Sequence, residues 1–162
     1  MKKKSWIPWG IVMIVLLALD QAAKAYFSAN RAQFQEREIL PGFFYLTYLE
    51  NRGAAFSMLQ NFRWGFVALT VVAVIVMFRF FIVQQEFWAR LPLTLLIAGA
   101  VGNLVDRAAQ GYVVDFLHFY PFGYNFPVFN VADICVTVGA VLLAVWLLFL
   151  YREPGVKDAD KA

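Results

Sequence analysis

The stretch VVDFLHFYPFGYNFPVFNVADI, from Val113 to Ile134, holds two carboxylates, Asp115 and Asp133, with no lysine or arginine between them. Burying an ionised carboxylate is costly, so apolar sequence either excludes such residues or uses them. Two close carboxylates cannot both ionise cheaply, and they share one proton. One member then activates a water as base, while the protonated member polarises a peptide carbonyl. The pair therefore predicts hydrolysis of the aspartic-protease type.

Other catalytic chemistries have fewer residues to carry them. His118 has no obvious nucleophile beside it and is expected to pack or to lie at the surface. Cys135 lies two positions from Asp133, on a different helix face, and is expected to pack. Ser57 with Lys24 is the competing nucleophile, as a serine–lysine dyad, but it leaves the aspartates unexplained. One cysteine and one histidine exclude an intramolecular disulfide framework and give no basis for a metal cluster.

Further polar residues recur at helical spacings within apolar sequence. Charges in a transmembrane segment cost at least about 2.5–3.5 kcal/mol each and usually face a bundle interior or a polar cavity. Residues three or four apart share a helix face. The sequence has three such groups: Asp20 with Lys24; Asn103 with Asp106 and Arg107; Asn130 with Asp133. Each group alone is compatible with a simple helix anchor.

The elements that must position these residues are membrane helices. Hydrophobic residues make up 62% of the 162 residues and charged residues 15%, whereas soluble domains have about 45–50% and about 25%. Four stretches approach the roughly 20 apolar residues that a span needs: 6–27, 62–83, 91–109 and 130–151. We expect one mainly α membrane domain over residues 1–151 and a short polar cytoplasmic tail over 152–162. A net charge of +3 with scattered basic residues gives no support for nucleic-acid binding.

Positive charge in the short loops predicts that both termini are cytoplasmic. With four spans, the basic residues on that side are Lys2, Lys3, Lys4, Arg79, Arg90, Arg152, Lys157 and Lys161. The first outer loop also carries arginines, which glutamates accompany: Arg31, Arg37, Arg52 and Arg63 with Glu36, Glu38 and Glu50. A rival interpretation of the first segment is a cleavable signal peptide that ends at the Ala23–Ala25 site. Four uncleaved spans give a more consistent distribution of positive charge between the two sides of the membrane, which favours an uncleaved helix.

The outer loop, about residues 28–61, is too long for a simple turn. Its run GFFYLTYLENRGAAFSM begins with β-prone aromatics and reaches a turn signal at ENRG, which predicts a short hairpin or small sheet at the outer membrane surface. These aromatics and those of the 116–129 loop suit an interfacial belt. They are equally compatible with capping of the helix bundle.

Topology brings the polar residues to one level of the membrane. The first span ends outside, the third ends outside near Gly111, and the fourth begins there, so all three polar groups converge with Asn51 just below the outer surface. Asp115, in the loop, meets Asp133 there because Pro121, Gly123 and Pro127 fold the chain back. A convergent polar site in apolar surroundings is the default hypothesis for an active site.

Four blocks in order resemble one family. DQAAKAY from Asp20, ENRGAAFSML from Glu50, GAVGNLVDRAAQGYVVDF from Gly99 and FNVADI from Phe129 are similar to lipoprotein signal peptidase, the type II signal peptidase of bacteria. The blocks extend over nearly the whole membrane portion, with no departure at the motif positions. Residues 28–44, His118 and the tail lie outside them.

The resemblance implies an aspartic endopeptidase of the bacterial inner membrane, with four transmembrane helices, a small extracytoplasmic β-cradle and a short surface helix. Its substrates would be prolipoproteins, cut on the amino side of a cysteine that carries diacylglycerol. Asp115 and Asp133 match the catalytic positions. Residues that brace the dyad or contact substrate would be Asn51, Asn103, Arg107 and Asn130, and further motif positions with supporting roles are Asp20, Lys24, Gly53 and Asp106. No metal or organic cofactor is expected. The protein is expected to contact membrane lipids and to be a monomer.

Two other classes stay open on the residues alone. A small proton-coupled carrier also holds carboxylates among a few helices, and an assembly protein uses charges only to pair helices. The clustering at the outer ends of the helices and the position of Asp115 in a loop favour hydrolysis over transport.

Overall fold

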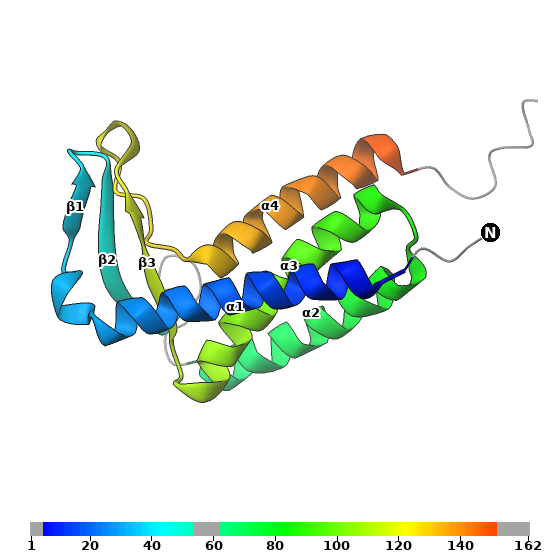
Figure 1. The fold of residues 1–162 in the computed structure, drawn as a ribbon, viewed down its shortest axis with the longest axis horizontal. Coiled ribbons are helices and arrows are strands. Elements are labelled where there is room, and N and C mark those ends of the chain that lie inside the picture. The colour runs from blue at the N-terminus through cyan, green and yellow to red at the C-terminus, as the bar shows by residue number, and fades with distance from the viewer. Residues whose placement is uncertain (1–4, 54–61, 152–162) are drawn as a thin grey trace, which may run out of the picture.

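The computed structural model describes residues 5–53 and 62–151, in which four long helices run side by side and a small sheet lies across one end (Figure 1). The helices are α1 (Ile7–Ala29), α2 (Arg63–Val83), α3 (Phe87–Ala109) and α4 (Val131–Val145), and a π-helical turn, η4 (Trp146–Leu150), continues α4. Each of the four spans is long and apolar enough to cross a membrane. The four predicted spans are therefore confirmed, although α3 begins at Phe87, four residues earlier than expected.

Helix α3 is the central helix of the bundle, because it packs against α1, α2 and α4. Over half of its most apolar window, 56%, is buried, against 6% for α2. The outward faces carry large exposed hydrophobic side chains, such as Leu69, Val72 and Ile75 on α2. Contiguous apolar surface of this kind is unfavourable in water and suits the hydrocarbon of a bilayer.

Small residues let the helices approach closely around α3. A Cβ atom added at Gly139 of α4 would lie 3.0 Å from the backbone nitrogen of Leu96 on α3. One added at Gly102 of α3 would lie 2.6 Å from Asp20 Oδ2 on α1. Close approach at small residues is the usual way in which membrane helices pack. At Gly102 it also makes room for a buried carboxylate.

The sheet has three antiparallel strands in the order β1 (Arg37–Leu40), β2 (Phe44–Asn51) and β3 (Val113–Phe119). The small sheet predicted in the outer loop is confirmed, but its first turn lies at Gly42, with φ +66°, between β1 and β2. The expected turn at ENRG is not the hairpin turn, because Glu50 and Asn51 are the last residues of β2. The loop expected to hold Asp115 is instead strand β3, where Asp115 lies opposite Leu49 of β2. The strand was not predicted because its run VVDFLHF lacks the alternation of apolar and polar residues that marks a half-buried strand. Most of its residues are buried.

Aromatic packing fixes the sheet to the end of α1. Phe27 of α1 stacks on Phe116 of β3 with ring centroids 4.2 Å apart, and both belong to a buried cluster with Phe34 and Val114. Two short 3-10 helices lie at this end of the molecule, η1 (Arg31–Gln33) and η3 (Pro121–Gly123). The sheet therefore has a defined position over the ends of α1, α3 and α4 that face it (Figure 1).

Candidate active site

The start of α4 carries Asp133 in a reciprocal cap with Asn130. The Asn130 side-chain oxygen accepts a 2.9 Å hydrogen bond from the backbone nitrogen of Asp133, and Asp133 Oδ2 accepts one of 3.1 Å from the backbone nitrogen of Asn130. Such a capping box satisfies two backbone donors that a helix start leaves free. The sequence spacing of three that predicted a shared face is here the spacing of a cap. The Asp133 carboxylate is thereby held at the helix terminus.

Asp20 of α1 satisfies a third donor of the same helix end. Its Oδ1 accepts a 2.9 Å hydrogen bond from the backbone nitrogen of Ala132. Its Oδ2 forms a 2.8 Å ion pair with Lys24, one turn later on α1, as the spacing predicted. Asp20 thus links the start of α4 to the buried lysine.

Lys24 is almost completely buried, and polar atoms surround its ammonium group. Besides Asp20, Nζ lies 2.8 Å from Asp106 Oδ2 and donates a 2.9 Å hydrogen bond to Asn103 Oδ1. An ammonium has three protons to donate, and three acceptors are present. A buried lysine is tolerated when it is paired and hydrogen-bonded in this way.

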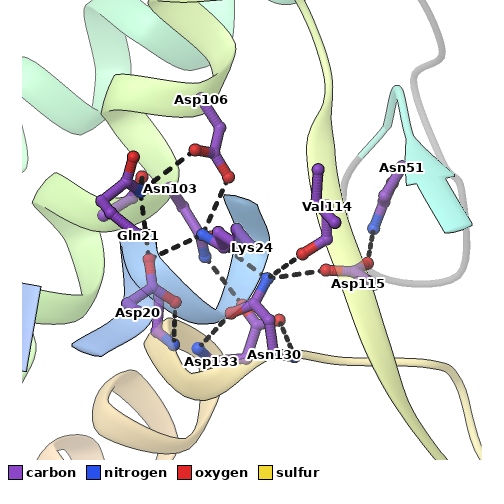
Figure 2. Close-up of polar contacts among 12 residues, drawn as sticks. Asp20, Gln21, Lys24, Asn51, Asn103, Asp106, Val114, Asp115, Asn130 and Asp133 are labelled. Carbon is purple, nitrogen blue, oxygen red and sulfur yellow. Dashed lines mark hydrogen bonds and ion pairs between the residues drawn. The ribbon is translucent and has the colours of Figure 1, made fainter. Parts of the chain in front are cut away.

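Asn103 transmits this arrangement to the candidate dyad. Because its Oδ1 accepts from Lys24, its Nδ2 is oriented outward, and it donates a 2.8 Å hydrogen bond to Asp133 Oδ1. Figure 2 shows this chain of contacts from Lys24 through Asn103 to the start of α4. Both oxygens of Asp133 therefore have a defined donor, Asn103 for one and the Asn130 backbone for the other.

Asp115 approaches from the opposite side, on β3, and is 1% exposed. Two amide side chains hold it: Asn130 Nδ2 donates to Oδ1 at 2.6 Å, and Asn51 Nδ2 donates to Oδ2 at 2.9 Å (Figure 2). Burial raises the pKa of Asp115 to about 7, and the neighbouring charge of Asp133 adds to the rise, while the two amide donors oppose it. A carboxyl group with this pKa can hold or release a proton near neutral pH.

A cleft of about 710 Å³ brings both carboxylates to one space. Its volume lies within the range of roughly 300–1,000 Å³ that is usual for binding sites. The residues that line it come from β2, α3, β3, α4 and the segment before α4: Leu49, Asn51, Asn103, Arg107, Val113, Asp115, His118, Asn125, Phe126, Pro127, Val128, Phe129, Asp133, Val136 and Thr137. The lining combines apolar side chains with convergent polar groups, which suits a site that binds a peptide or small molecule.

Arg107 also lines this cleft but faces differently from its neighbours on α3. Asn103 and Asp106 contact Lys24, whereas Arg107 donates a 3.3 Å hydrogen bond to the backbone oxygen of Gly53 and lies 5.3 Å above the Phe66 ring. The three residues therefore do not share one environment as expected: Asn103 and Asp106 contact Lys24, whereas Arg107 contacts Gly53 and Phe66. Arg107 and Gly53 lie together where β2 ends beside α3.

The structure places all ten predicted site residues in this region, and it adds Gln21. The Gln21 amide nitrogen donates to Asp20, to the backbone oxygen of Gly102 and to Asp106, at 3.1–3.2 Å. Sequence reasoning passed over Gln21 because it is uncharged, although it lies within the DQAAKAY block. Ser57 lies outside the described residues, so the serine–lysine alternative is not tested. Among the described residues, no group of three His, Cys, Asp or Glu side chains is placed to hold a metal ion.

Known proteins are similar to this chain over most of its length. The sequence model of the family described as signal peptidase (SPase) II matches residues 12–149. A lipoprotein signal peptidase of Symbiobacterium thermophilum is 47% identical, over 88% of this chain and 95% of that protein. Another, of Streptococcus pneumoniae, is 41% identical, over 91% of this chain and 95% of that protein.

The fold is also found in solved structures. One, described as a bacterial membrane enzyme, matches with a TM-score of 0.84 at 34% identity, over 91% of this chain and 92% of the other. A second, with the same description, matches with a TM-score of 0.82 at 33% identity. Helices, sheet and sequence agree over the region that contains the cleft, and the chain belongs to the signal peptidase II family.

Proposed function

We propose that Asp115 and Asp133 are the catalytic dyad of an aspartic endopeptidase that removes the signal peptide from diacylglyceryl-modified prolipoproteins. The chain is a lipoprotein signal peptidase by family. The observation that carries the assignment of residues is that both carboxylates line one cleft, each held by amide donors. Aspartates that merely paired helices would have cationic partners, as Asp20 and Asp106 do.

The two carboxyl groups divide the work by sharing one proton. The ionised member takes a proton from a water molecule, which attacks the scissile carbonyl, and the protonated member donates a hydrogen bond to the carbonyl oxygen. Asp115, whose pKa is raised to about 7, suits the exchange of a proton near neutral pH. Cleavage on the amino side of the lipidated cysteine would leave the diacylated cysteine as the new amino terminus.

The remaining polar residues support the dyad in three ways. Asn51, Asn103 and Asn130 orient the carboxylates by direct hydrogen bonds. Lys24 orients Asn103, and Asp20 and Asp106 neutralise Lys24. Arg107 lines the cleft where β2 ends and donates to the backbone oxygen of Gly53, a position suited to binding the substrate backbone.

The proposed location is the bacterial inner membrane, with the site near the outer leaflet and both termini in the cytoplasm. The start of α1 and the end of η4 lie at the end of the bundle away from the sheet, which supports termini on one side (Figure 1). A substrate anchored by its own apolar segment and acyl chains would present its scissile bond at the level of the sheet. Reporter fusions after Lys4 and after Tyr151 should both report cytoplasm, and an external location of either fusion would contradict this orientation.

The dyad is tested with Asp115→Asn and Asp133→Asn, which change volume little and remove the ionisable group. Each should abolish cleavage of a diacylated prolipoprotein by the purified enzyme, and the double variant should be scarcely worse than either single one, because residues that act as a unit are not additive. Ser57→Ala is the matched control and should retain turnover. Robust cleavage by either asparagine variant, or complete loss in Ser57→Ala alone, would favour the serine–lysine mechanism. Equal membrane levels of all variants are checked by immunoblot.

A further inference from the structure

The segment that returns from the sheet to α4 forms one wall of the cleft. Five consecutive residues, Asn125 to Phe129, line it. Backbone hydrogen bonds hold this wall to β3 at two places. Phe126 donates to the oxygen of Phe119 at 3.0 Å. Phe129 donates to the oxygen of Leu117 at 3.0 Å, and its own oxygen accepts from Leu117 at 2.8 Å and from Phe116 at 3.0 Å. Pro127 and Val128 lie between these attachments. The wall is thus a short span fixed near both ends, facing the same space as the two aspartates.

His118 adds a side-chain attachment at the near end of this wall. The residue is 6% exposed, and its Nε2 lies 2.8 Å from Asn125 Oδ1. The other ring nitrogen has weaker neighbours, Thr47 Oγ1 at 3.5 Å and the Glu36 carboxylate at 3.8 Å. The ring also packs against Tyr120, with centroids 4.5 Å apart. His118 is thereby held in one orientation, with Nε2 directed at Asn125.

We infer that His118 is a positioning residue that sets the width of the substrate cleft through its hydrogen bond to Asn125. The inference rests on the proposed function, because it assigns the wall to the peptide residues that flank the scissile bond. His118 makes none of the hydrogen bonds that orient the two aspartates, which come from Asn51, Asn103 and Asn130. Its loss should therefore weaken the fit of substrate and leave the chemical step intact.

The kinetic test compares His118→Ala, His118→Gln and Thr47→Val with wild type on a diacylated prolipoprotein. His118→Ala should raise KM by about three- to tenfold, the effect of one lost hydrogen bond, with kcat within about twofold of wild type. His118→Gln, which keeps a donor for Asn125, should restore most of the affinity. Thr47→Val is the matched control, because it removes the weaker contact on the other ring nitrogen, and should resemble wild type.

Two further variants test the route through Asn125. Asn125→Ala should reproduce the effect of His118→Ala, and the double variant should be no worse than either, because both changes remove one interaction. A widened cleft should also discriminate less against a substrate whose residue before the cysteine is enlarged. Relative kcat/KM for the enlarged substrate should therefore rise in His118→Ala. Additive losses, or unchanged discrimination, would overturn the inference.

Hydrogen–deuterium exchange separates this inference from the proposed function, because it requires no activity. The peptide that contains residues 125–129 should exchange faster in His118→Ala than in wild type, and protection should recover in His118→Gln. Faster exchange combined with wild-type KM would show that the wall does not contact substrate. Unchanged exchange would show that His118 does not hold the wall, and a loss of kcat at constant KM would overturn its role in the fit of substrate. A wild-type enzyme that fails to cleave the prolipoprotein would instead contradict the proposed function.

Discussion

Asn130 donates a 2.6 Å hydrogen bond to Asp115 on β3 and, with its oxygen, caps the helix that carries Asp133. One buried amide therefore orients both carboxylates, with its donor on one and its acceptor at the backbone of the other. An asparagine is suited to this position because it offers a donor and an acceptor without charge. The same contact joins the sheet to the helical bundle.

Substitutions at Asn130 should separate capping from catalysis. Asn130→Ser keeps a neutral capping oxygen but loses the amide donor to Asp115, so we expect activity to fall by roughly a hundredfold or more, with a smaller loss of stability than in Asn130→Ala. Asn130→Ala should lose both functions and destabilise the protein by about 1 kcal/mol. Turnover assays and thermal unfolding in detergent measure the two effects. Asn30→Ala, at the half-buried C-cap of α1 and away from the dyad, is the control. Full activity in Asn130→Ser would contradict the role given to this donor.

The pH dependence of kcat/KM should report the proton that the dyad shares. Because burial raises the pKa of Asp115 to about 7, activity should decline as pH rises through about 7 and that proton is lost. The Asn51 amide stabilises the ionised form of Asp115 and so lowers its pKa. Asn51→Leu should therefore move the alkaline limb of the profile to higher pH. A shift to lower pH would contradict the assignment of this limb to Asp115.

Stability should also depend on Asp115. A carboxyl group whose folded-state pKa is raised from 3.8 to about 7 holds its proton more tightly when folded. That contribution to stability is complete below pH about 4 and is lost as pH rises to about 7. Asp115→Asn has no such proton, so the difference between the thermal midpoints of variant and wild type should grow in the variant's favour across this range. A difference in thermal midpoint that stays constant across this pH range would mean that Asp115 is not the group whose pKa is raised.

Removing the charge of Lys24 should destabilise the whole helical bundle. Lys24→Met leaves two buried carboxylates, Asp20 and Asp106, without their partner, which we expect to cost about 3–5 kcal/mol. Adding Asp106→Asn should recover part of this loss, because it removes one uncompensated charge. Chemical denaturation in detergent, followed by circular dichroism, measures both effects. An equally unstable double variant would mean that the ion pair to Asp106 is not the source of the loss.

Replacing Arg107 by lysine should reduce activity while the protein still inserts. The guanidinium group stacks on Phe66 and reaches the backbone oxygen of Gly53, and an ammonium cannot reproduce the planar group that makes both contacts. We expect a loss of at least about tenfold in kcat/KM with normal membrane levels. Arg52→Lys, at an exposed surface ion pair, is the control. Wild-type turnover in Arg107→Lys would reduce Arg107 to an anchor at the membrane surface.

Local pattern predicted the helices, because a membrane span is a long apolar run that needs no knowledge of its neighbours. Asp20 and Lys24, and likewise Asn130 and Asp133, are also close in sequence, and the spacing of each pair predicts that its members share one face of a helix. What pattern could not give is the pairing of β3 with β2, since hydrogen-bond partners distant in the chain leave no periodic signal. Gln21 was not predicted for the same reason, because two of its hydrogen-bond acceptors, Gly102 and Asp106, lie on α3, far away in the sequence.

The cap of α4 also orders events during biosynthesis. Its donors are satisfied partly by Asp20, more than a hundred residues earlier in the chain, and Asp133 takes its hydrogen bond from Asn103 on α3. Asn103 and Asn130, which hydrogen-bond to Asp133, are therefore synthesised before Asp133 itself. Until Asn130 at the start of α4 is in place, Asp115 lacks the hydrogen bond from the Asn130 amide. If Asp115 and Asp133 form the proposed dyad, the site is incomplete until the fourth helix has been synthesised.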